Sequence, residues 1–230
     1  MNNPVPYENA MFKSEYFDDY TDDDLPKDLV INITVDLACT EREYSDYTVI
    51  LPVGIDPFGD LWVLPYHRAR YADPDKIIGE ILNMYIKYSD NPRPGWKFGR
   101  LGVEKVAFQR FLIKGLDKER KARGLHFPIE ELEAKGDKVQ RISQLQPWFS
   151  AGDIHIRNSM VELKEELLDF PKARHDDIAD ALSHTLNFLS KKPVPKTATQ
   201  ERWKVTAEDQ RVKILGRKII DLKPKVWSRF

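Results

Sequence analysis

The 230 residues, of which 41% are hydrophobic and 32% charged, allow one generous globular domain or two small ones. The single cysteine, Cys39, excludes an internal disulfide and a thiolate metal cluster, and it agrees with reducing surroundings. No apolar run approaches the roughly 20 residues that span a bilayer, and the acidic start lacks a signal-peptide pattern, so we expect a soluble, cytoplasmic protein without a membrane partner.

Charge is unevenly distributed along the chain, although its net value is only −1. Residues 1–28 carry eight acids against two lysines, and we predict that they form an acidic leader or linker. Residues 191–230 carry twelve lysines and arginines against four acids, which indicates a basic C-terminal tail. This tail either docks on an anionic partner or is a solvated, disordered end. The predicted domain lies between these segments, over residues 29–190.

The first part of this domain is predicted to be three antiparallel strands. Residues 29–36 are mostly apolar and β-branched, which is typical of a strand buried on both faces, and the run ends in Asp36. Two more strands are expected near 47–53 and 61–66. The glycines and proline of residues 54–60 predict a hairpin turn between them.

Helices and further strands follow. Asp73 and Pro74 predict the start of a helix that runs to about Ser89, because aspartate caps helices and proline suits their first position. A fourth strand over 98–104 ends in Glu104. The remaining expected elements are a helix from about 108, a short strand at 126–129, a helix from 137 towards 146, a strand at 154–156, and helices at 161–168 and 175–190. This order predicts an α/β fold with a mixed central sheet flanked by helices.

The helix expected from His175 begins with an unusual concentration of acids, Asp176, Asp177 and Asp180. Side chains three or four residues apart share a helix face, so these like charges repel one another. A divalent cation with hard oxygen ligands would offset that repulsion. The alternative is an acidic first turn that interacts with the helix dipole above a stripe of core residues.

Asp36 and Glu104 each end an apolar strand, and in open α/β sheets sites gather at the carboxyl ends of strands. We therefore expect these acids to meet the start of the last helix. Hydrolysis of a phosphodiester by two metal ions needs such carboxylates, and Mg²⁺ or Mn²⁺ suits them. The alternatives are that Asp36 caps a turn and that Glu104 pairs with Lys105 or Arg110.

The order of these motifs resembles the nuclease domain of the large terminase subunit of tailed bacteriophages. The resemblance covers about residues 29–190, and the segment 11–16 resembles the one that follows the family's motor domain. The motifs that carry it are Val35-Asp36-Leu37-Ala38, Ser45-Asp46-Tyr47, Val103-Glu104, Gly136-Asp137-Lys138-Val139-Gln140-Arg141, Ala151-Gly152-Asp153-Ile154, Phe170-Pro171 and His175-Asp176-Asp177-Ile178-Ala179-Asp180-Ala181-Leu182.

This resemblance implies an RNase H-like fold and a metal-dependent endonuclease that cuts concatemeric double-stranded viral DNA. It implies Asp36, Glu104, Asp176 and Asp177 as catalytic metal ligands, with Asp36 bridging two ions. Which of Asp176 and Asp177 faces the metals stays open, and Asp180 is an additional candidate ligand. His175 either orients a ligand, contacts a phosphate or caps the helix.

Two basic residues of the predicted helix from 137, Lys138 and Arg141, share a face and are candidate DNA-phosphate contacts. The alternative is an exposed pair that balances Asp137.

The chain contains no Gly-x-x-x-x-Gly-Lys-Ser/Thr phosphate loop, so its ATP-driven motor would be a separate domain. The resemblance implies that motor, the small terminase subunit and the portal protein as partners in the host cytoplasm. A RuvC-like junction resolvase and a non-catalytic DNA- or portal-binding module are the alternative functions.

Overall fold

The computed structural model describes residues 10–37, 47–71, 73–90, 93–104, 109–133 and 136–189. Cys39, Asp46 and the predicted basic tail lie outside them. The strands are β1 (Asp18–Tyr20), β2 (Leu29–Asp36), β3 (Thr48–Ile55), β4 (Leu61–Val63), β5 (His67–Ala69), β6 (Trp96–Glu104), β7 (Ile129–Leu132) and β8 (Ile154–Arg157). The helices are α1 (Pro74–Ser89), α2 (Gln109–Ala122), α3 (Lys138–Ser143), α4 (Gln146–Ala151), α5 (Val161–Asp169) and α6 (Asp177–Thr185), with 3-10 turns η2 (Ser14–Tyr16), η3 (Asp22–Asp24) and η4 (Leu186–Phe188).

One mixed sheet organises the fold. Its strand order is β1-β8-β4-β3-β2-β6-β7, and β5 pairs with β3 beside this path. Strands β2, β3 and β4 are antiparallel, whereas β6, β7 and β8 join through parallel pairs. The predicted mixed sheet with three antiparallel strands and later parallel additions is therefore confirmed.

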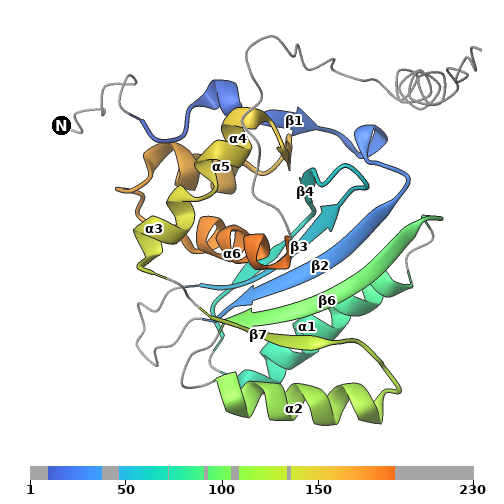
Figure 1. Cartoon of the computed structure of the whole chain (residues 1–230). Helices are drawn as coiled ribbons and strands as arrows, with labels where there is room; N and C mark the ends of the chain where they lie inside the picture. Colours follow the sequence, from blue (N-terminus) through green and yellow to red (C-terminus); the bar gives the residue numbers. More distant parts are fainter. Residues whose placement is uncertain are drawn as a thin grey trace, which may run out of the picture.

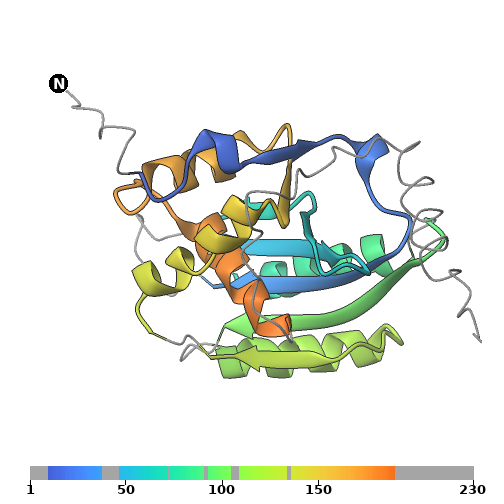
Figure 2. The same cartoon turned by 45° about the horizontal axis from the view of Figure 1, so that its top comes forward.

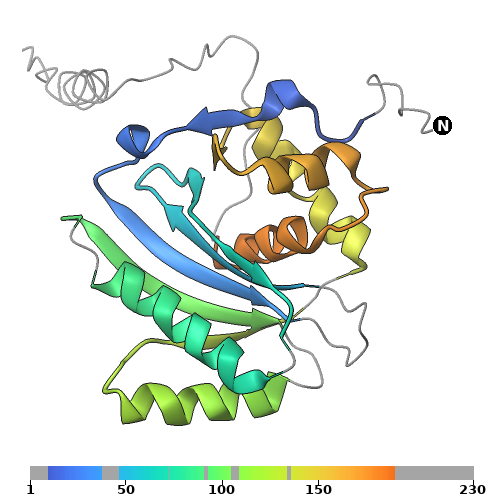
Figure 3. The same cartoon turned by 180° about the vertical axis from the view of Figure 1, so that it is seen from behind.

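Helices cover both faces of the sheet. Helices α1 and α2 lie on one face, and α3 to α6 lie on the other (Figure 1). Figure 3 shows α1 in front of the sheet when the molecule is seen from behind, running roughly along the strands. Each face has its own apolar core, and strand β2 is buried from both sides, as its β-branched sequence predicts.

Alternation along β2 assigns its side chains to the two faces. Ile31, Ile33 and Val35 belong to the core beneath α1 and α2. Because successive side chains of a strand point to opposite faces, Thr34 and Asp36 point toward α6. The Thr34 hydroxyl donates a 2.9 Å hydrogen bond to the carbonyl oxygen of Ala181, which ties α6 to the strand two residues before Asp36.

Prolines explain three differences from the sequence-based element boundaries. The strand expected over 61–66 ends at Val63, before Pro65, and is followed by β5, which was not predicted; the strand expected at 126–129 begins only after Pro128. The helix expected from 137 to 146 is divided into α3 and α4, with Pro147 in the first turn of α4. Proline lacks the amide hydrogen that would continue a strand ladder or a helix. The last helix is also shorter than expected, because it begins at Asp177 and passes into η4 after Thr185.

The described part of the acidic leader packs against the domain. Strand β1 pairs in parallel with β8 at the sheet edge, and Figure 2 shows this segment running along the molecule above the sheet. Phe12 is 0% exposed and meets Phe149 edge to face at 5.7 Å between ring centroids. The Lys164 ammonium lies 2.7 Å from the Asp19 carboxylate. Residues 10–28 are thus an integral edge of the fold.

Within the described residues, no helix is both long enough and apolar enough to cross a lipid bilayer.

Candidate metal centre

Two of the predicted acids meet because of strand register. Strands β2 and β6 are parallel neighbours in which Val35 pairs with Val103, so the next residues, Asp36 and Glu104, lie side by side on the face toward α6. The two carboxyl groups share a hydrogen bond. Asp36 is only 8% exposed. The ends of two apolar strands therefore supply a pair of adjacent acids.

The protonation of this pair is asymmetric. Burial and the hydrogen bond to Glu104 raise the pKa of Asp36 well above its usual range. The His184 imidazole, the hydrogen bond from Asp36 and the nearby Arg141 guanidinium lower the pKa of Glu104. The two shifts run in opposite directions, so Asp36 takes up a proton more readily than Glu104 does.

Helix α6 brings a third acid, Asp180, which is 3% exposed and adds to the negative potential at Asp36. Arg141 of α3 binds both oxygens of Asp180, with Nε at 3.1 Å from Oδ1 and Nη2 at 2.7 Å from Oδ2. The same Nη2 lies 3.9 Å from Glu104 Oε1. Asp36, Glu104 and Asp180 thus form one carboxylate cluster, defined here by these three residues, with Arg141 as its main counter-charge.

The neighbouring acids of α6 face different partners. The Lys138 ammonium lies 2.6 Å from Asp176 Oδ1 and 3.8 Å from Asp180 Oδ2, so Asp176 joins the rim of the carboxylate cluster through that lysine. Asp177 instead lies 3.4 Å from the Arg68 guanidinium. Lys138 and Arg141, expected to be either DNA contacts or an exposed pair, are both engaged with acids of the site.

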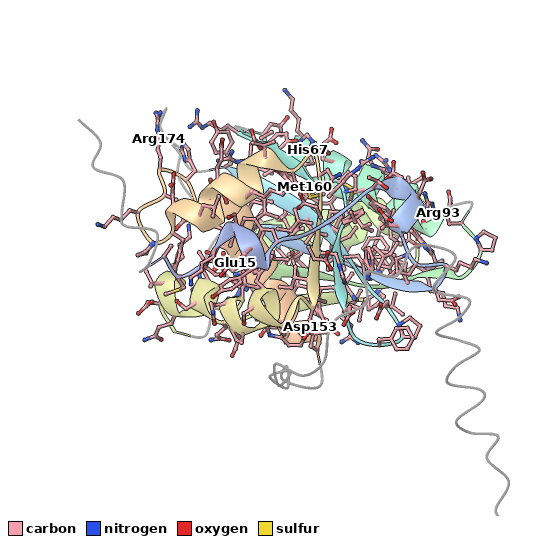
Figure 4. All side chains as sticks on the ribbon, turned by 90° about the horizontal axis from the view of Figure 1, so that it is seen from above. Glu15, His67, Arg93, Asp153, Met160 and Arg174 are labelled. Atoms are coloured by element: carbon pink, nitrogen blue, oxygen red, sulfur yellow. The ribbon has the colours of Figure 1, made fainter. Side chains whose placement is uncertain are left out.

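Asp177 belongs to a second charged group, whose partners differ from those of Asp180. Arg68 of β5 also lies 3.5 Å from Glu166, and its guanidinium stacks over the Tyr47 ring at 3.9 Å. His175 meets Tyr47 edge to face and lies 3.9 Å from Asp177. In Figure 4, His67 of β5 and Arg174, which comes just before this run, lie on one side of the molecule, away from Asp153.

Sequence reasoning missed the group that caps α6. Glu166 of α5 accepts hydrogen bonds from the backbone amides of Ile178 at 2.9 Å and Ala179 at 3.0 Å, which are free at the start of a helix. Burial raises the pKa of this carboxyl to about 7. Because Glu166 is remote in sequence from the amides it caps, no local pattern reveals it.

His184 was also missed, although a signal existed, because it follows Asp180 by four residues and so shares its helix face. Its Nε2 atom lies 3.6 Å from Glu104 Oε1. Arg141 and His184 line a cavity of about 190 Å³ together with Gln144, Ser183 and other residues. Among the described residues, no group of three or more histidine, cysteine and acidic side chains is arranged as it stands to hold a metal ion.

No protein-family model and no curated protein sequence matches this chain. Solved structures do match its fold. The nuclease domain of the large terminase of Thermus phage P74-26 aligns with a TM-score of 0.53 and 18% identity, covering 82% of this chain and 100% of that one. The human cytomegalovirus terminase nuclease domain, manganese-soaked and inhibitor-bound, aligns with a TM-score of 0.50 and 16% identity, covering 69% and 82%.

The large terminase of a thermophilic bacteriophage, in complex with ADP, aligns with a TM-score of 0.51 and 14% identity over 77% of this chain. The aligned part is 43% of the chain of that ADP-bound terminase, so this protein spans less than half of its length. The mixed sheet, its covering helices and these alignments agree, and this chain has the fold of the nuclease domain of viral large terminases.

Proposed function

We propose that this chain is the nuclease domain of a viral DNA-packaging terminase, a divalent-metal-dependent endonuclease that cuts concatemeric double-stranded DNA in the infected bacterial cell. The observation that carries the proposal is the convergence of Asp36, Glu104 and Asp180 at one edge of the sheet. These three acids come from two strands and a helix, and all three are buried or nearly so. Packing alone gives no reason to bury three carboxylates together.

The carboxylate cluster suits a divalent cation. Its oxygen donors are the hard ligands that Mg²⁺ and Mn²⁺ prefer. The guanidinium of Arg141 offsets the charge of Asp180, and burial beside Glu104 raises the pKa of Asp36, which favours its uncharged form. The related cytomegalovirus domain was soaked with manganese, which agrees with this choice of metals. We assign Mg²⁺ or Mn²⁺ to the site, with two ions as the working stoichiometry.

Bound ions of this kind activate the attacking water and stabilise the leaving oxygen of a phosphodiester. The chain's own residues hold the reacting groups. Asp36 interacts with both Glu104 and Asp180, so it would be the acid shared between the bound ions. Asp176 reaches the cluster through Lys138, whereas Asp177 lies beside Arg68. We therefore place Asp180 ahead of Asp177 as the third ligand.

Arg141 and Lys138 are the residues that we propose bind the DNA backbone. The planar guanidinium of Arg141 already forms a two-pronged contact with Asp180, and the same geometry fits a phosphate. Once cations neutralise the acids, both basic side chains become available for phosphate. His175 and Arg68, which share the Tyr47 ring, extend the candidate DNA surface.

The motor domain, the small terminase subunit and the portal protein are proposed partners. A chain without a phosphate loop that matches 43% of the ADP-bound phage terminase depends on a separate ATPase for translocation. In this proposal, this chain cleaves the DNA and the motor domain translocates it.

Cleavage of supercoiled and linear plasmid by the 230-residue chain in Mn²⁺ or Mg²⁺ tests the proposal. We expect Mn²⁺ to support faster cutting, because its geometric demands are looser, and we expect Asp36→Asn and Glu104→Gln to abolish cutting. Glu130→Gln is the matched control, because Glu130 is an exposed strand acid paired with Arg100 on the neighbouring strand. Full activity of Asp36→Asn would refute the proposal. Exclusive cutting of four-way junctions would indicate a resolvase instead, and DNA binding without cutting would indicate a binding module.

A further inference from the structure

His184 is a buried imidazole that the packing of the domain does not explain. It lies on α6, one turn after Asp180, and is 1% exposed. Neither Nδ1 nor Nε2 makes a hydrogen bond of good geometry among the described residues, and the pairing of the ring with Glu104 is loose, at 3.6 Å. Buried polar side chains are nearly always hydrogen-bonded, because removing such a group from water without compensation is unfavourable. An apolar residue at this position would avoid that cost, so a role for the ring nitrogens is indicated.

The ring is aimed at the carboxylate cluster. Nε2 lies 3.6 Å from Glu104 Oε1, which is too long for a good hydrogen bond. Adjacent ligands of one octahedral ion are about 3 Å apart and opposite ligands about 4 Å, so this separation lies within the range of a shared cation. His184 and Arg141, which lie 3.6 Å and 3.9 Å from Glu104, also line a cavity whose lining does not include the three acids of the cluster.

We propose that His184 is a nitrogen ligand of the cation held by the carboxylate cluster, and that it sets the preference of this site among divalent metals. In this role the imidazole would keep its proton on Nδ1 and offer the Nε2 lone pair to the cation. Imidazole binds borderline transition metals much better than it binds Mg²⁺, whereas carboxylates favour the hard cations. A site of Asp36, Glu104, Asp180 and His184 is therefore tuned toward transition metals. This inference rests on the metal site of the proposed function.

The first test is the ratio of Co²⁺ to Mg²⁺ affinity, measured by calorimetry without DNA. We expect His184→Gln to weaken Co²⁺ binding about tenfold or more while changing Mg²⁺ binding only about twofold. His126→Gln, in the loop before β7 and away from the carboxylate cluster, is the matched control and should leave both affinities unchanged. An equal loss for both metals, or no loss for either, would overturn the assignment of His184.

The second test needs no variant and so stays decisive if His184→Gln fails to fold. Pulsed electron paramagnetic resonance of Mn²⁺ bound to the wild-type chain reports nitrogen nuclei in the coordination shell. We expect a ¹⁴N coupling that changes to ¹⁵N when the histidines are ¹⁵N-labelled. Bound Mn²⁺ without nitrogen coupling would overturn the inference alone. Absence of any Mn²⁺ binding would instead count against the proposed function.

A coupling that persists in His184→Gln and disappears in His175→Gln would move the nitrogen ligand to His175, and this too would overturn the assignment. The comparison is informative because His175 is the other histidine beside an acid of the same helix, at 3.9 Å from Asp177.

Discussion

Glu166→Gln should change how the stability of the metal-free domain depends on pH. Glu166 is 5% exposed, and burial raises the pKa of its carboxyl from 4.5 to about 7. A carboxyl whose pKa is higher in the folded state stabilises the fold below its unfolded pKa, and this stabilisation is lost as the pH rises through the folded pKa. The glutamine side chain keeps an oxygen that accepts from the Ile178 and Ala179 amides, but it does not ionise.

The magnitude follows from the two pKa values. At about 1.4 kcal/mol per pKa unit, the full effect is about 3 kcal/mol, and roughly 2.5 kcal/mol of it falls between pH 5 and pH 8. We therefore expect the stability of wild type, relative to Glu166→Gln, to fall by about 2.5 kcal/mol across this interval. Groups common to both proteins, including Asp36 and the histidines, cancel in the comparison.

Urea unfolding of both proteins at pH 5, 6, 7 and 8, with a chelator present, measures this difference. Glu162→Gln is the control, because Glu162 lies on the same helix near Arg68 but is exposed. A difference between wild type and Glu166→Gln that stays constant with pH would refute the reasoning, since it would mean that the Glu166 carboxyl keeps its charge in the folded protein.

Three further predictions concern the links that hold the site. Thr34→Val removes the hydroxyl that donates to the Ala181 carbonyl, so thermal unfolding should show a loss of about 1 to 2 kcal/mol; no change would mean that another donor satisfies the carbonyl. Arg141→Gln leaves Asp180 buried without its main counter-charge and should cost about 3 kcal/mol in chelator, much of it restored by Mn²⁺. Phe12→Ala should lower the free energy of unfolding by about 3 to 5 kcal/mol in chemical unfolding, because the Phe12 ring is fully buried. A loss below about 1 kcal/mol would show that residues 10–28 do not stabilise the fold.

The strand half of the site could be predicted from sequence. A β-branched run that ends in an acid indicates a buried strand with a carboxylate at its tip, and Asp36 satisfies that pattern; Glu104 ends a strand in which Val103 is the only β-branched residue. Their contact follows from the parallel pairing of β2 and β6, since neighbouring strands of equal register bring their ends together. The sequence pattern and the strand pairing both place Asp36 beside Glu104, so predicting this contact needed no knowledge of side-chain packing.

The helix half could not be predicted, because it depends on how α6 is rotated against the sheet. The side chains of three acids, Asp176, Asp177 and Asp180, project from the start of α6 at different angles around the helix axis. Their spacing alone does not say which of them points toward β2. Two tertiary contacts fix the rotation: the Thr34 hydroxyl at Ala181 and the Glu166 cap at Ile178 and Ala179. Both partners are far from α6 in sequence. The burial of Phe12 was missed for a similar reason, since the surrounding acids obscured an isolated apolar residue.

The two charged groups around α6 have a common consequence for the order in which the site assembles. Asp180 is neutralised by Arg141, and Asp177 is neutralised by Arg68. Both arginines belong to elements other than α6, so the packed domain itself supplies counter-charges to the two acids. Cation binding then competes with Arg141 and is opposed by the raised pKa of Asp36, which lowers the apparent metal affinity but frees a guanidinium when the acids are occupied. A backbone phosphate supplies the negative charge that this guanidinium has lost. Metal and DNA are therefore expected to bind with positive coupling, each raising the affinity of the site for the other.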